Sequence, residues 1–178
     1  MSAMARRDMM KIDIGALLRG EVDVVNVEYA LEIEPVPEVR FTSPASVSGT
    51  ISGNAGYTRL VIDVSVPYVA ECARCLDEIS GVFFTTVERT CVNKKEISAE
   101  ELEENEDEYL IIKENSVDPD DAVNDTVYFE FPKKLLCSED CKGLCPDCGK
   151  KLTDGHSCGG NKKKLDPRFA ALEHLFDE

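Results

Sequence analysis

The sequence lacks tryptophan, has only two histidines and contains no long hydrophobic run. None of its apolar stretches approaches the roughly 18 residues that a membrane-spanning helix needs, and no apolar signal-peptide stretch precedes Lys11. A Ser-His-Asp or Cys-His-Asn set is not indicated, and Gly53 and Gly56 lie in a turn rather than a phosphate-binding loop. We therefore expect a cytoplasmic protein that is not an enzyme, with neither a membrane nor a small-molecule substrate as a partner.

Cysteine is the most informative residue type, with eight in 178 residues. A reducing cytosol disfavours a disulfide framework, which leaves metal binding or redox chemistry. Residues 72–75 and 145–148 are CxxC knuckles, a turn that aims two sulfurs at one tetrahedral Zn²⁺. A CxxxC pair and a later His and Cys add further donors. The predicted metal ligands are Cys72, Cys75, Cys137, Cys141, Cys145, Cys148, His156 and Cys158.

Two other interpretations of the cysteines compete with metal binding. A free cysteine is often part of a core, which fits Cys91 but not Cys137 to Cys158, because those lie among Ser, Asp, Lys and Gly. A redox dithiol is less favoured, because neither knuckle follows a strand and opens a helix. We expect one or two zinc ions, and a structural role for them, because a shell filled by protein leaves no position for a substrate.

Alternating apolar residues predict β-strands in the first half of the chain. Strands are expected at 25–33, 45–51, 60–68 and 82–87, with the first CxxC knuckle at the tip that joins the last two. Residues 109–112 add a strand, and residues 121–131 favour a helix although Val127-Tyr128-Phe129 has strand propensity. Asp166 and Pro167 open a last amphipathic helix, with Phe169, Leu172, Leu175 and Phe176 on one face.

The predicted fold class is α+β, with an antiparallel sheet or a partly open barrel. We expect a β-rich domain at residues 11–132 with an acidic insertion at 93–120. A cysteine-rich zinc-binding segment at 133–165 would pack on the 72–75 knuckle, and a C-terminal helix would span 166–178.

The net charge of −15 is unevenly distributed. Residues 93–125 hold 13 acidic side chains against three lysines, which is typical of a solvated loop or an exposed helix face. Residues 133–168 reverse the sign, with nine basic side chains against five acidic ones before any cysteine ionises. This basic segment is compatible with phosphate contacts, and equally with a solvated rim that balances nearby acids.

Three blocks of sequence occur in a fixed order: Cys72-Ala73-Arg74-Cys75-Leu76, the stretch CSEDCKGLCPDCG from Cys137 to Gly149, and Asp166-Pro167-Arg168-Phe169-Ala170-Ala171-Leu172. With the β-rich first half and the acidic middle, they resemble the YceD family, in the form that carries a C-terminal CxxxCxGLCPxCG block. These are bacterial proteins with plastid relatives, named large ribosomal RNA subunit accumulation proteins. Relatives with this block end it with a CxC pair, whereas Gly160 stands at the second position here and His156 is the available substitute.

The resemblance implies how the ligands divide. Members without the GLCPxCG block keep the first knuckle and a Cys or His near the CxxxC pair, which favours one site of Cys72, Cys75, Cys137 and Cys141. The second site would then hold Cys145, Cys148 and Cys158, with His156 as a further ligand. The rival partition joins the two CxxC knuckles in one ribbon-like site.

The resemblance also implies a function: a zinc-binding ribosome-biogenesis factor that supports accumulation or processing of large-subunit (23S) ribosomal RNA. Its partner would be that RNA or a pre-ribosomal particle, with a ribosomal protein as a further partner. The alternatives are a zinc-stabilised adaptor that docks its acidic segment onto a ribosomal or other nucleic-acid-associated protein, and, less favoured, a thiol redox protein. The candidate RNA-binding residues are Arg74, Lys142, Lys150, Lys151, Lys162, Lys163, Lys164 and Arg168.

Overall fold

The computed structural model describes residues 10–54, 57–95, 97–105, 107–152 and 156. Its elements, in chain order, are β1 (Ile12–Asp13), α1 (Gly15–Leu18), β2 (Val24–Leu31), β3 (Val39–Phe41), β4 (Ala45–Asn54), β5 (Tyr57–Glu71), β6 (Glu78–Asn93), α2 (Ala99–Glu104), β7 (Tyr109–Ile112), β8 (Ser116–Val117) and α3 (Asp120–Glu130). No helix in this part of the chain is long and apolar enough to cross a membrane.

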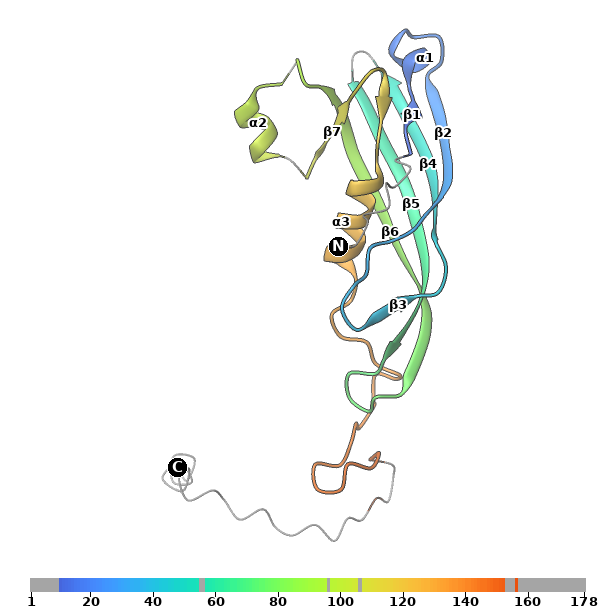
Figure 1. Ribbon diagram of the computed structural model, residues 1–178, viewed down its shortest axis with the longest axis vertical. Helices are drawn as coiled ribbons and strands as arrows, with labels where there is room; N and C mark the ends of the chain where they lie inside the picture. The colour runs from blue at the N-terminus through green and yellow to red at the C-terminus, as the bar shows by residue number, and fades with distance from the viewer. Residues whose placement is uncertain (1–9, 55–56, 96, 106, 153–155, 157–178) are drawn as a thin grey trace, which may run out of the picture.

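One six-stranded sheet dominates the structure: five strands follow the order β2-β4-β5-β6-β7, and the sixth, β3, also pairs with β5 (Figure 1). β5 pairs with β4 along its first part, up to Ser65, and with the short β3 beyond it, at Tyr68 to Ala70. On its other side β5 pairs with β6 without interruption from Thr58 to Glu71. The β5–β6 hairpin is therefore the longest ribbon of the sheet, and its tip carries the first CxxC knuckle.

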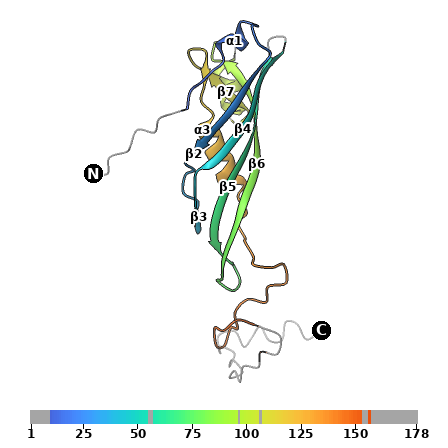
Figure 2. The same cartoon turned by 90° about the vertical axis from the view of Figure 1, so that its right-hand side faces the viewer.

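The core lies between one face of this sheet and α3. Every second residue of β5 points inward, and Leu60, Ile62 and Val64 are almost fully buried against Val123 and Val127 of the helix. Figures 1 and 2 show α3 lying along this face, while the opposite face stays open. α3 also anchors the chain that follows β2, because the buried Asn124 Oδ1 accepts the Glu34 N–H at 2.8 Å.

The predicted α+β class is confirmed, as are the helix over 121–131, the core position of Cys91 and the main strands. One pairing differs from an all-antiparallel sheet, because β7 runs parallel to β6. After β6 ends, the acidic connection that contains α2 returns the chain to the level of Thr90. β7 starts there and runs beside the last residues of β6 in the same direction. The short elements β1, α1, β3 and β8 were not predicted. The helix predicted at 166–178 lies outside the described residues.

Phe131 closes the core at the end of α3 and directs the chain toward the hairpin tip. Its side chain is only 4% exposed, and its ring lies 5.0–6.0 Å, centroid to centroid, from those of Phe41, Tyr68 and Phe83. These are edge and tilted contacts of the kind that aromatic rings favour. β3, β5, β6 and α3 therefore meet at one ring cluster.

Replacing Phe131 with alanine should lower the free energy of unfolding by about 3–5 kcal/mol, because it opens a cavity where four elements meet. Phe129 is the matched control, since it lies two residues away but is 73% exposed. Phe129→Ala should change the unfolding free energy by about 0.5 kcal/mol or less. Urea denaturation of both variants measures this, and equal losses would contradict the assignment of Phe131 to the core.

Candidate metal centre

The first knuckle is built into the turn between β5 and β6. The Cys72 N–H donates to the Asp77 carbonyl at 2.7 Å, and the Leu76 N–H donates back to the Cys72 carbonyl at 2.9 Å. Leu76 takes a left-handed conformation (φ 63°) to close this turn. The turn thereby brings the sulfurs of Cys72 and Cys75 together, and both residues are buried.

The second knuckle repeats the same hydrogen bonds 73 residues later. The Cys145 N–H donates to the Lys150 carbonyl at 2.7 Å, and the Gly149 N–H donates to the Cys145 carbonyl at 2.8 Å. Gly149 takes the left-handed position here (φ 69°), which glycine adopts without strain. An isolated bridge between Leu144 and Lys151 flanks the turn. Both CxxC motifs therefore fold as the same local structure.

Four sulfurs converge at the first knuckle: those of Cys72, Cys75, Cys137 and Cys141, all within 4.8 Å of one another. The Cys72 and Cys141 sulfurs are 3.8 Å apart, and those of Cys75 and Cys137 are 3.6 Å apart. These separations are too long for a disulfide bond, whose sulfurs lie about 2.05 Å apart. They match the edge of about 3.8 Å of a tetrahedron with metal–sulfur bonds of about 2.3 Å. The four thiols fit one zinc ion, and we call them site one.

Three donors converge at the second knuckle: Cys145, Cys148 and His156, also within 4.8 Å of one another. The Cys148 Sγ lies 3.4 Å from the His156 Nε2, close to the roughly 3.5 Å expected for a sulfur and a nitrogen on one tetrahedral zinc. We call this group site two. Three protein donors leave one position of a tetrahedron, and Cys158, the fourth predicted ligand, lies outside the described residues.

Backbone N–H groups favour the thiolate form of the first cysteine in each knuckle. Those of Arg74 and Cys137 lower the pKa of Cys72 to about 6, and those of Cys148 and Asp147 lower the pKa of Cys145 to about 6. The Asp77 N–H acts in the same direction on Cys75, but burial and the neighbouring thiols outweigh it and raise the pKa of Cys75 to about 12. Cys72 and Cys145 therefore ionise readily as metal ligands, whereas Cys75 would give up its proton on binding a metal ion.

Site one joins the hairpin to a segment more than 60 residues later by several contacts besides the sulfurs. The Ala73 N–H donates to the Leu135 carbonyl at 2.9 Å, and the Cys137 N–H donates to Cys72 Sγ at 3.4 Å. The Arg74 guanidinium donates to the carbonyls of Cys141, at 2.7 Å, and Glu139, at 3.3 Å. These bonds fix the loop that carries Cys137 and Cys141.

The two sites are also connected to each other. Lys151, next to the second knuckle, forms an ion pair with Asp77 of the first. Gly143 (φ 79°) lies against the backbone of the first knuckle, where a Cβ at this position would be 3.0 Å from the Arg74 carbonyl oxygen. The short stretch between Cys141 and Cys145 therefore packs against the first knuckle. The sulfurs of the two knuckles nevertheless fall into separate groups, each with its own later donors, rather than into one shared site.

Three of the candidate RNA-binding residues have partners within the chain. Arg74 and Lys151 are engaged in the intramolecular contacts described above, and Lys142 also has an intramolecular interaction. Lys150 is exposed, while Lys162, Lys163, Lys164 and Arg168 lie outside the described residues. Asp77 was not singled out from the sequence, although the shared CxxC spacing marks the turns that place Asp77 and Lys151.

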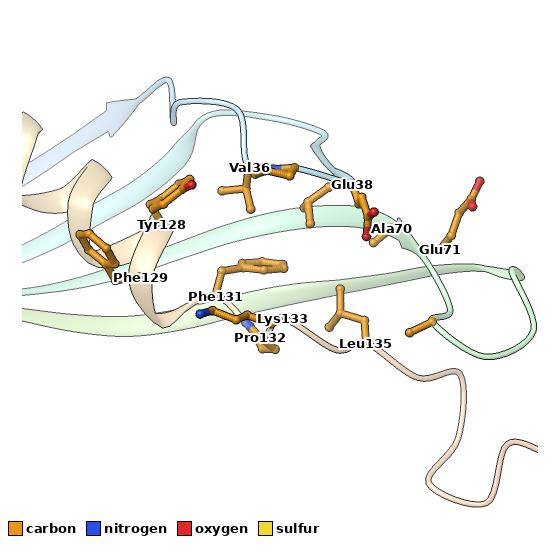
Figure 3. A pocket seen from close by; sticks show the side chains of 13 residues that line it. Val36, Glu38, Ala70, Glu71, Tyr128, Phe129, Phe131, Pro132, Lys133 and Leu135 are labelled. Carbon is orange, nitrogen blue, oxygen red and sulfur yellow. The ribbon is translucent and has the colours of Figure 1, made fainter. Parts of the chain in front are cut away.

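An apolar groove of about 440 Å³ adjoins site one (Figure 3). Its floor and walls include Val39 and Ala70 of the sheet, Phe131, and Leu135 of the segment that leads to the cysteines. Tyr128 and Phe129 lie at the end of the groove that is farther from the hairpin tip, as Figure 3 shows. The segment from Phe131 to Leu135 is thus both a wall of this groove and the approach to site one.

Fold and site together define a class: a β-sheet protein that carries two cysteine-rich groups, each able to hold a metal ion, at and beyond the tip of its longest hairpin. The chain belongs to the YceD family, since the family model described as large ribosomal RNA subunit accumulation protein YceD matches residues 60–176. The resemblance carried by the sequence blocks is thereby confirmed.

The chain is similar to several bacterial proteins. The chain is 35% identical over 112 residues to the uncharacterized protein Rv2926c of Mycobacterium tuberculosis, covering 63% of this chain and 52% of that protein. It is 26% identical over 149 residues to the uncharacterized protein YlbN of Bacillus subtilis, covering 79% of each. The chain thus spans about half the length of the mycobacterial relatives it matches. No solved structure matches it.

Substituting the last cysteine of each knuckle should remove one metal ion at a time. We expect protein purified without chelator to contain two zinc ions per chain. Cys75→Ser should retain the ion of site two and Cys148→Ser that of site one, because the two sites share no sulfur among the residues that the structure describes. Elemental analysis measures this, with Cys91→Ala as the control, since Cys91 lies in the core. Loss of the same ion from both serine variants would contradict the two-site geometry.

Proposed function

We propose that this chain is a non-enzymatic zinc protein of bacterial ribosome biogenesis that supports the accumulation of large-subunit (23S) ribosomal RNA in the cytoplasm. Membership of the YceD family supports the link to ribosomal RNA. The convergence of four sulfurs from two distant segments supports zinc as the cofactor, because thiolate sets of this geometry suit a structural zinc ion. With all four positions of site one filled by protein, the ion would serve structure rather than catalysis.

The observation that carries the proposal is the join at site one. The segment after Pro132 has few apolar residues of its own, so a metal that binds Cys137 and Cys141 to the hairpin would supply the free energy that orders it. An ordered basic segment presents its charges at fixed positions, which phosphate recognition requires. By ordering this segment, the metal would fix the positions of the basic side chains that contact RNA.

The exposed basic side chains near the cysteines divide into two groups, to which we assign different roles. Arg74 and Lys151 hold the cysteine-rich segment in place, so their loss would act on the metal sites first. Lys133, Lys134 and Lys150 are exposed. We assign the phosphate contacts of the described region to these three lysines.

A second candidate function rests on α2. This helix carries four exposed glutamates, Glu100, Glu101, Glu103 and Glu104, and is capped by the Ser98 hydroxyl, which accepts the Glu101 N–H at 3.1 Å. In Figure 1 it stands away from the sheet. Such a helix suits docking to a basic ribosomal protein, in which case RNA would be held indirectly.

In cells, loss of site one should lower the amount of 23S ribosomal RNA. We expect Cys137→Ser, introduced at the chromosomal locus, to reduce 23S relative to 16S RNA as strongly as deletion of the gene, because the cysteine-rich segment would no longer be ordered. Cys91→Ala is the control and should keep the wild-type ratio at equal protein level. Normal 23S RNA in the deletion strain would overturn the proposed function.

In vitro, binding to purified 23S RNA should weaken with added salt. Lys133→Ala/Lys134→Ala should reduce the slope of log K against log salt concentration by roughly 0.7 to 0.9 for each lost phosphate contact. Lys94→Ala/Lys95→Ala is the matched control, being another adjacent pair of exposed lysines, and should leave the slope unchanged.

Two results would count against direct RNA binding. One is wild-type binding that does not depend on salt. The other is a variant with the four glutamates of α2 replaced by glutamine that binds RNA normally but no longer associates with the large-subunit precursor. The second result would favour the adaptor function, since glutamine keeps the helix propensity and removes the charge.

A further inference from the structure

The outer edge of β6 is open along most of its length. One side of this strand pairs with β5 from Glu78 to Cys91, but β7 covers the other side only from Thr90 to Asn93. Between Ile79 and Arg89 no other strand of the described chain pairs with that side. Main-chain N–H and C=O groups along such an edge are available to another strand.

This edge has few of the features that normally keep sheet edges apart. Natural edge strands are commonly protected by charged side chains, above all lysine, by proline, by a bulge or by short length. Residues 79–89 contain neither lysine nor proline, their charged side chains are Glu88 and Arg89 at the end next to β7, and the uninterrupted register with β5 shows no bulge. β6 has 16 residues, twice as many as β2 at the opposite edge of the sheet. The edge is therefore long, regular and unblocked.

Two apolar side chains beside this edge are exposed on the open face of the sheet. Phe84 is 72% exposed and Val82 is 49% exposed. They are two residues apart on one strand, so they lie side by side on the same face. An added strand would cover both of them, which supplies apolar burial in addition to main-chain hydrogen bonds.

We propose that this edge pairs with the same edge of a second copy of the chain, in antiparallel orientation and with Phe84 at the two-fold axis. This register uses the whole open stretch of both copies, because Phe84 is its midpoint. It places Val82 opposite Thr86, Ser80 opposite Glu88 and Ile79 opposite Arg89 of the second copy. No two like charges face each other, and Glu88 already forms an ion pair with Arg59 of its own chain. The stretch is thus complementary to itself, as a two-fold interface requires.

The dimer would have a defined architecture. Its two sheets would join into one, with both α3 helices on the same face. The two hairpin tips would point in opposite directions, because the paired β6 strands are antiparallel. The metal sites of the two copies would then lie at opposite ends of the assembly.

Charge introduced at this edge tests the proposal. We expect sedimentation equilibrium to show a wild-type dimer and Val82→Lys to raise its dissociation constant at least tenfold, because two lysines would flank the two-fold axis on an apolar surface. Val24→Lys is the matched control, since Val24 is also 49% exposed, on the same open face, but belongs to β2. It should leave the dissociation constant unchanged.

A second variant and a second measurement keep the outcome decisive. Phe84→Lys would place two like charges at the axis and should also give monomers, with circular dichroism confirming that both lysine variants remain folded. Amide hydrogen exchange at residues 79–89 should slow as wild-type protein concentration rises. A wild-type monomer at 0.5 mM, a dimer that survives both lysine variants, or loss of the dimer in Val24→Lys would overturn the proposal; the last would assign it to the β2 edge.

Discussion

The join between the β5–β6 tip and the Cys137–Cys141 loop is the constraint on which the rest of the structure depends. The hairpin can project because its strands pair without interruption, and the later segment has a fixed path because its sulfurs and carbonyls meet the tip. Once deprotonated, sulfurs about 3.8 Å apart would repel one another unless a cation lay between them, so a bound metal ion would stabilise this arrangement of thiolates. The positions of the four sulfurs agree with the tetrahedral coordination that zinc prefers. The second knuckle is held in place by its contacts with the first.

Local sequence patterns were sufficient to predict most of the sheet. Alternation between Leu60 and Tyr68 and the β-branched stretch after Val82 are strong signals, because one face of each strand is buried. β3 escaped prediction because it consists of three residues whose strand character depends on pairing with Tyr68 to Ala70, which is a tertiary contact. The parallel entry of β7 could not be foreseen for the same reason, since direction depends on how α2 returns the chain.

The candidate site shows a similar division. The cysteine spacing pointed to the donors that converge in the described residues, because a CxxC turn is a local structure that a short sequence encodes. The spacing could not identify the contacts of Arg74 and Lys151, whose partners are main-chain carbonyls and an aspartate of the other knuckle. From the sequence alone, a lysine or arginine beside a zinc knuckle is equally compatible with binding a phosphate and with bracing the fold.

The wall of the apolar groove has a consequence of its own. The stretch from Phe131 to Leu135 is held at one end by the ring cluster and at the other by the Ala73–Leu135 hydrogen bond, two residues before Cys137. Because this stretch reaches both, a metal ion bound at site one would favour the present shape of the groove, and a molecule bound to the groove in that shape would favour metal retention by the same free energy. The shape of the groove in Figure 3 would in this way respond to a metal ion bound at site one, which the groove adjoins.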